Sequence, residues 1–207
     1  MHKVLILFGS SGSLGSEAII YFSKQHYDNY YFVSRKPLEL TLLPNQKNIV
    51  TGDLTIEENV ESVFSQIDTS EQTEVFLFSS IGMYYGNKFI YEIPYSNFLE
   101  TIKVNLNTSF LIAKHFSKLI LKSYGGSICF TSAISSLKNE VKNSIYGISK
   151  NALNYLVKSL AEEGKEYNLS SNAVAPFIID TKENREWVTD KSILITPENI
   201  LKNVQHI

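Results

Sequence analysis

The chain has 207 residues, 43% of them hydrophobic and 19% charged, and its formal net charge at pH 7 is −2. This length suits one globular domain, residues 1–207, with a full hydrophobic core. The near-neutral charge argues against nucleic acid and anionic membranes as partners, and the single cysteine, Cys129, argues against a disulfide framework or a metal site.

The first predicted element is a strand at residues 4–8, where five consecutive apolar residues indicate burial on both faces of a parallel sheet. The run is far too short to cross a bilayer and no signal-peptide cleavage pattern follows it, so we expect a cytoplasmic protein. The glycine-rich turn G-S-S-G-S-L-G at residues 9–15 comes next, followed by a helical pattern that contains Ala18, Ile19 and Phe22.

This order of strand, glycine turn and helix is the context in which a glycine motif predicts dinucleotide binding. Glycines let the backbone approach a pyrophosphate closely, and a helix N-terminus offers free N–H groups and the positive end of its dipole. The alternative is a plain Gly/Ser turn without a ligand.

The second predicted strand, residues 31–33, is followed by the basic pair Arg35 and Lys36. An acidic residue at this point binds the ribose of NAD, whereas a basic one accommodates the 2′-phosphate of NADP. Arg35 therefore favours NADP(H), unless it is only a solvated turn residue.

A short third strand is predicted at residues 49–51, and Asp53 follows it. Asp53 is placed either to meet the adenine end of a cofactor or to cap the next helix. That helix begins with Glu57 and Glu58, and its apolar stripe extends to Ile67.

The fourth strand, residues 75–78, leads into the small residues 79–82, which let the backbone pass close to a ligand. The segment 83–97 is rich in aromatic residues and either lines a substrate entrance or is held on the surface by its rings.

A helix follows with an apolar stripe at Phe98, Ile102, Leu106 and Phe110, and further apolar residues on its other side predict burial on two sides. One side would pack on the sheet and the other on a partner subunit. Asn105 is polar within this helix, so it either stabilises a core through hydrogen bonds or belongs to a site.

We interpret Gly125-Gly126 as a turn and residues 127–131 as the fifth strand, in which Cys129 is expected to be a buried, inert thiol. Ser132 lies at the carboxyl end of this strand, where ligands bind in open α/β sheets.

Tyr146 and Lys150 are four residues apart at the start of a long predicted helix, so their side chains share one face. An ammonium beside a phenol favours the phenolate and lowers the pKa of the tyrosine, which suits proton exchange with a substrate oxygen. The motif alone is common by chance.

The sixth strand is predicted at residues 172–175 and is closed by Pro176. The segment 177–192, which contains the only tryptophan, Trp187, is interpreted as a mobile flap over the site. A last helix is expected to begin at Pro197 with Thr196 as its cap.

Taken in order, these features resemble the short-chain dehydrogenase/reductase family over nearly the whole chain. The resemblance implies a doubly wound parallel sheet of the Rossmann type in three α/β/α layers, a nicotinamide cofactor, and hydride transfer between that cofactor and a carbonyl/alcohol substrate. It also implies a homodimer or homotetramer, here paired through helices at 98–120 and 148–162.

By this resemblance Tyr146 would be the general acid/base, Lys150 would hold the nicotinamide ribose, Ser132 would bond the substrate oxygen and Asn105 would hold a water in a proton relay. The cofactor-binding set implied for NADP(H) comprises Gly9, Ser11, Gly12, Ser13, Leu14, Gly15, Arg35, Asp53, Leu54, Ser79, Ser80, Ile81, Tyr146, Lys150, Pro176, Ile179 and Thr181.

Several positions depart from the family pattern. Ser13 replaces a usual glycine, Phe177 follows Pro176 where glycine is usual, and Ser132 lies one residue farther from Tyr146 than is common, with Ala133 at the usual spacing. The glycine spacing, this alanine and the turn from Pro176 to Thr181 resemble dihydropteridine reductases, a branch of the family whose NADH preference does not fit Arg35.

We predict an NADP(H)-dependent oxidoreductase acting on a small carbonyl substrate. Two alternatives stay open at this point. One is a non-catalytic NADP(H)-binding sensor or scaffold on the same fold, and the other is a sugar-nucleotide epimerase or dehydratase, for whose usual larger C-terminal domain the chain leaves no room.

Overall fold

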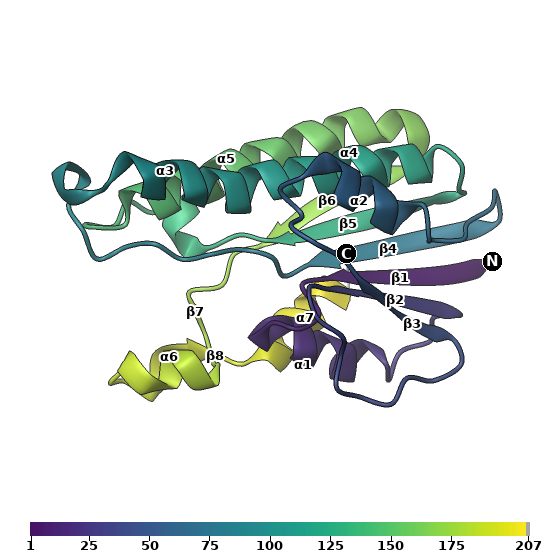
Figure 1. Ribbon diagram of the computed structural model, residues 1–207, viewed down its shortest axis with the longest axis horizontal. Coiled ribbons are helices and arrows are strands. Elements are labelled where there is room, and N and C mark those ends of the chain that lie inside the picture. Colours follow the sequence, from purple (N-terminus) through teal and green to yellow (C-terminus); the bar gives the residue numbers. More distant parts are fainter. Residues whose placement is uncertain (206–207) are drawn as a thin grey trace.

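The computed structural model describes residues 1–205, which form a six-stranded parallel sheet between two layers of helices (Figure 1). The sheet strands are β1 His2–Phe8, β2 Asn29–Ser34, β3 Gln46–Val50, β4 Thr73–Ser79, β5 Gly125–Thr131 and β6 Leu169–Val174. Their order in the sheet is β3-β2-β1-β4-β5-β6. The predicted doubly wound α/β fold and its six strands are therefore confirmed, and the strand order reverses between β1 and β4.

The helices are α1 Ser13–Phe22, α2 Glu57–Phe64, α3 Tyr95–Ile102, α4 Thr108–Ile120, α5 Ser144–Glu163, α6 Lys182–Trp187 and α7 Pro197–Gln205. Figure 1 shows α2, α3, α4 and α5 on one face of the sheet, with α1 and α7 on the other. A separate two-stranded parallel ribbon consists of β7 Ile178–Ile179 and β8 Leu194–Ile195, with α6 between them in the chain.

The apolar run of β1 explains why the core has two halves. Val4, Ile6 and Phe8 belong to the cluster under α2, α4 and α5, whereas Leu5 and Leu7 belong to the cluster under α1 and α7. All five are at most 2% exposed. The alternation of side chains along a strand thus supplies both faces of the sheet from one sequence.

The prediction of a turn at Gly125 and Gly126 is wrong. Both glycines are the first residues of β5. Gly126 lies against β4 so closely that a Cβ there would be 2.0 Å from the carbonyl oxygen of Val75, and Gly125 has a φ of +150°. The glycines are therefore needed for close strand contact and backbone conformation rather than for chain reversal.

The long helix predicted from Phe98 onward is interrupted. A five-residue π-helical turn, Lys103–Asn107, separates α3 from α4 and widens the helix at Asn105. The buried positions around this turn include the polar residues Thr101, Asn105 and Ser109, whereas the buried positions further along α4 are mostly apolar. Phe110 of the predicted apolar stripe is 49% exposed.

The other predicted elements are present with small shifts at their ends. The third strand ends at Val50, and α2 ends at Phe64, although Ile67 beyond it is still buried in the core. Cys129 is buried as expected, and burial raises the pKa of its thiol to about 12. Thr196 Oγ1 accepts a hydrogen bond from Asn199 N at 3.3 Å, so it caps α7 as predicted.

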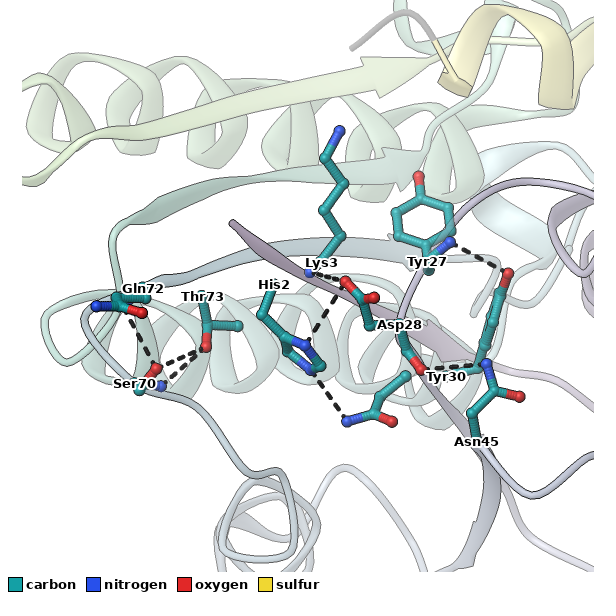
Figure 2. A network of polar contacts seen from close by, with 10 residues as sticks. His2, Lys3, Tyr27, Asp28, Tyr30, Asn45, Ser70, Gln72 and Thr73 are labelled. Atoms are coloured by element: carbon teal, nitrogen blue, oxygen red, sulfur yellow. Dashed lines mark hydrogen bonds and ion pairs between the residues drawn. The ribbon is translucent and has the colours of Figure 1, made fainter.

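The amino ends of the strands are tied together by polar side chains (Figure 2). Asp28 accepts a hydrogen bond from the backbone N–H of Lys3 at 2.7 Å and lies 3.6 Å from His2 Nδ1. Asn45 donates to the carbonyl of Asp28 at 3.1 Å. These contacts lie at the edge of the sheet opposite the carboxyl ends of the strands.

Within residues 1–205, no helix is both long enough and apolar enough to span a membrane.

Candidate active site

A cavity of about 630 Å³ lies at the carboxyl ends of β4, β5 and β6. Residues of the predicted site that line it are Ser80, Ile81, Ser132, Tyr146, Lys150, Pro176 and Ile179. Tyr84 and Trp187 line it as well, so the aromatic segment after β4 and the segment around α6 both reach the cavity. The cavity is the sheet-edge crevice where doubly wound folds bind ligands.

Tyr146 and Lys150 enter this cavity from the first turns of α5. Lys150 is 2% exposed, and its Nζ donates a hydrogen bond to the carbonyl of Thr131, at the end of β5, at 2.8 Å. The same Nζ lies 6.0 Å from the centre of the Tyr146 ring. The predicted shared face is therefore present, and the sheet fixes the position of the lysine.

The expected lowering of the Tyr146 pKa is wrong. Burial raises the pKa of Tyr146 to about 12, and the nearby Tyr84 and Glu140 add to the rise because they disfavour a second negative charge. Burial also lowers the pKa of Lys150 to about 8. At neutral pH the tyrosine consequently holds its proton.

Both polar atoms of the Asn105 side-chain amide form hydrogen bonds within the protein. Its Oδ1 accepts from Met83 N at 2.7 Å, and its Nδ2 donates to Met83 O at 3.0 Å and to Ser149 Oγ at 2.9 Å. It thereby joins the segment after β4 to α5, directly beneath Lys150. A Cβ on Gly82 would lie 2.8 Å from Lys150 Nζ and 3.3 Å from Asn105 Oδ1, so these residues are closely packed.

Ser132 lines the cavity, but its hydroxyl group forms a hydrogen bond within the cavity wall. Its Oγ donates to Ser136 Oγ at 3.2 Å, and Ser136 in turn donates to the carbonyl of Ala133 at 2.6 Å and accepts from Asn154 Nδ2 at 2.7 Å. Ser132 is 2% exposed. Ala133 also lines the cavity, without a hydroxyl.

The glycine turn, residues 9–15, lies outside this cavity. Two close contacts determine its shape, one between Gly15 and Gly9 and one between Gly9 and Ser80. A Cβ on Gly15 would lie 2.0 Å from the carbonyl oxygen of Gly9, and Gly9 itself has a φ of +82° and lies against Ser80. Gly12 caps α1 without a side-chain hydrogen bond, so no side chain competes for the first N–H groups of the helix. Ser11 and Ser13 are exposed in this turn, whereas Leu14, in the first turn of α1, is buried.

Arg35 and Asp53 follow β2 and β3 at this same edge of the sheet, and both are exposed. Asp53 does not cap α2, because its carboxylate accepts from Thr55 N at 2.9 Å and the N-cap of α2 is Ile56. The Thr55 hydrogen bonds lower the pKa of Asp53. The Leu54 side chain is buried in the core.

The segment after Pro176 contains β7 and α6, and its predicted mobility stays a prediction. Thr181 caps α6 by accepting from Asn184 N at 3.2 Å, and Phe177 lies at the cavity with half of its surface exposed. Glu183 of α6 accepts a hydrogen bond from Ser13 Oγ at 3.1 Å, which ties this segment to the first turn of α1.

A polar cluster of the cavity, formed by Glu140, Asn143 and Tyr84, has no motif in the sequence. Glu140 Oε2 accepts from Ser135 Oγ and, at 3.0 Å, from Asn143 Nδ2, while Asn143 Oδ1 accepts from Tyr84 OH at 2.8 Å. The Tyr84 ring lies edge-on to Tyr146, with ring centres 5.0 Å apart. The only sequence signal was the polar character of residues 135–144.

In sequence, the chain is similar to several known reductases and dehydrogenases. The family model described as "Enoyl-(Acyl carrier protein) reductase" matches residues 36–198. A dihydropteridine reductase of Dictyostelium discoideum is 27% identical over 197 residues, which is 92% of this chain and 80% of that protein. A dehydrogenase/reductase SDR family member 6 of Aquarana catesbeiana is 27% identical over 97% of this chain and 80% of its own length.

Among solved structures, one described as ElxO with NADP bound superimposes with a TM-score of 0.89. It is 22% identical, and the match covers 100% of this chain and 91% of that one. This likeness concerns the fold, including the sheet edge at which the cavity lies.

Proposed function

This chain belongs to the short-chain dehydrogenase/reductase family, and we propose that it is an NADPH-dependent reductase that converts a small carbonyl substrate to an alcohol. The observation that carries the proposal is the placement of Tyr146 and Lys150 in one cavity at the carboxyl edge of the sheet. The dinucleotide preference is supported by Arg35 after β2 and by the NADP-bound protein of similar fold.

The residues present fit a dinucleotide. The contact of Gly15 with the Gly9 carbonyl brings the β1 end and the α1 start together, and the uncapped first turn of α1 supplies N–H groups for a pyrophosphate. Gly9, Ser11, Gly12, Ser13, Leu14 and Gly15 would hold this part. Arg35 would bind the 2′-phosphate, Asp53 and Leu54 would lie at the adenine, and Lys150 would bond the nicotinamide ribose.

The remaining cofactor contacts are proposed at the cavity itself. Ser79, Ser80 and Ile81 leave β4 where the nicotinamide side would lie, and Pro176, Ile179 and Thr181 approach from the other side. When bound, the nicotinamide supplies the hydride that adds to the carbonyl carbon.

The chain's own task is then to protonate the substrate oxygen. Tyr146 carries its proton at neutral pH, as the donor in a reduction must, although its pKa, raised to about 12 by burial, makes it a weaker acid than a free phenol. Asn105 holds the Met83 backbone against Ser149 and so keeps the entry of α5 in place. The direct test is consumption of NADPH over a panel of ketones, aldehydes, quinones and pterins, after NADPH binding has been measured.

Replacing Arg35 by aspartate tests the preference for NADP(H). We expect NADPH to bind about 10- to 100-fold more weakly, because charge-assisted hydrogen bonds to the 2′-phosphate are lost, while NADH binding changes far less. Titration of both nucleotides measures the two affinities. Lys47→Asp, the same charge change at an exposed position of β3, is the control. An unchanged NADPH/NADH ratio would make Arg35 an ordinary surface residue.

Ser132 and Ala133 can be tested as a pair. Because the Ser132 hydroxyl donates to Ser136, we expect Ser132→Ala to lower kcat by less than about tenfold. Ala133→Ser adds a hydroxyl to the cavity wall and is expected to raise kcat/KM. Steady-state kinetics on the best substrate of the panel decide the matter, and a loss above about 100-fold in Ser132→Ala would place its hydroxyl on the substrate.

Subunit pairing through α3, α4 and α5 is the proposed quaternary arrangement. These helices expose the apolar side chains of Tyr95, Leu99, Phe110, Ile148 and Tyr155 on the side away from the sheet. An exposed apolar face of this kind is typical of an interface. Light scattering in solution measures the number of subunits.

A further inference from the structure

The cavity is lined by one carboxylate among the described residues, that of Glu140. Glu140 and Lys150 are the charged residues that line the cavity within the described part of the chain. Lys150 turns its amine to the Thr131 carbonyl at 2.8 Å. Glu140 is therefore the one negatively charged side chain among the described residues that line the cavity.

The carboxylate is held in place rather than free to swing out. Ser135 and Asn143 both donate to its Oε2 oxygen. Its loop is fixed to the segment after β4, because Lys88 N donates to the Lys142 carbonyl at 3.3 Å and Lys142 Nζ lies 4.6 Å from the centre of the Phe89 ring. Two of these contacts connect separate loops, so the position of Glu140 is set before a ligand arrives.

One oxygen of this carboxylate is still available. Both protein hydrogen bonds reach Oε2, and within residues 1–205 no hydrogen bond reaches Oε1. The same cavity is also lined by the aromatic residues Tyr84, Tyr146, Phe177 and Trp187. A carboxylate together with aromatic rings is the combination that binds organic cations, through charge-assisted hydrogen bonds and cation–π contacts.

We propose that Glu140 forms an ammonium-binding subsite and that the substrate is a carbonyl compound carrying a protonated amine. The proposal rests on the reductase function proposed above. The ammonium donates to Glu140 Oε1 and lies among the rings, which leaves the carbonyl group for the Tyr146 hydroxyl. Glu140 is a specificity residue in this scheme and takes no part in proton transfer to the substrate oxygen.

Matched substrates test the subsite. N-methyl-4-piperidone and 4-methylcyclohexanone share one shape but differ in charge, and 4-(dimethylaminomethyl)benzaldehyde and 4-isobutylbenzaldehyde repeat the comparison at a longer spacing. We expect kcat/KM for the amine to exceed that for its neutral partner by at least about tenfold in one of the two pairs. In Glu140→Gln, which keeps the size and the Oε1 acceptor, this ratio should fall toward one.

When kcat/KM is measured for two substrates on one preparation, the ratio of the two values does not depend on the fraction of active protein. Glu163→Gln, an exposed carboxylate at the end of α5, should keep the wild-type ratio. Equal rates on both members of both pairs, or a ratio that Glu140→Gln leaves unchanged, would overturn the subsite and reduce Glu140 to a support of its loop. Absence of any NADPH consumption would instead contradict the proposed reductase function.

Discussion

Tyr146→Phe should lower turnover by about 10³-fold, the scale of a lost general acid, while NADPH affinity stays nearly unchanged. Within residues 1–205 the Tyr146 hydroxyl makes no hydrogen bond in the ligand-free protein, and its ring keeps its contact with Tyr84 in the variant. The substitution therefore removes one proton donor and leaves the packing intact. Single-turnover kinetics together with NADPH titration separate the two quantities.

Tyr124→Phe is the matched control, because Tyr124 is 54% exposed and precedes β5, whose other end lies at the cavity. It should behave as the wild type does. Unchanged turnover in Tyr146→Phe would contradict the acid role of this residue. Binding of NADPH without turnover in the wild type, on every carbonyl compound of the panel, would instead support a non-catalytic nucleotide sensor.

Lys150→Met should abolish turnover and weaken NADPH binding, yet it should not lower stability at neutral pH. The buried ammonium has its pKa lowered from 10.5 to about 8, which corresponds to a cost of about 3 kcal/mol for keeping it charged. Its one hydrogen bond, to Thr131 O, offsets only part of this cost. Methionine has a similar length and no charge, so it fills the space without the penalty.

The same residue gives a pH signature. Between the folded pKa of about 8 and the unfolded value of 10.5, the unfolded chain binds more protons at this position than the folded chain. Stability therefore rises with pH through this window, by about 2 kcal/mol between about pH 7 and about pH 9.5. Lys150→Met should lack this gain relative to the wild type.

Urea unfolding of wild type and variant at the two pH values measures the difference, in which the titration of all other groups cancels. Lys158→Met, an exposed lysine of the same helix, should keep the wild-type pH dependence. A stability difference that does not change with pH would show that the lysine is not held in a charge-disfavouring environment.

The strands and the order of the motifs could be predicted because their signals are local. The apolar run of β1 had to be buried on both faces, and the spacing of Tyr146 and Lys150 had to place them on one side of a helix. The glycine turn was likewise recognisable from its position between a strand and a helix. Most of the residues that we propose to bind the cofactor lie in these elements or directly after them.

The remaining features depend on packing between distant segments. Gly126 resembles a turn residue in sequence, and only its contact with Val75 shows why it lies in a strand. The π-helical turn contains Asn105, which forms hydrogen bonds with Met83 and Ser149, 22 and 44 residues away. The pKa of Tyr146 is governed by burial and by Glu140, whose approach no spacing rule indicates.

The burial of Cys129 has a practical consequence for following the protein in solution. A thiol sealed in the core, with its pKa raised to about 12, reacts very slowly with maleimides, which need the exposed thiolate. A cysteine introduced on the exposed surface of α6, for example at Glu186, would be the one readily labelled position in the described chain. A fluorophore attached there would sit beside Trp187 at the mouth of the cavity, and its emission would report arrival of either ligand without any change to the native thiol.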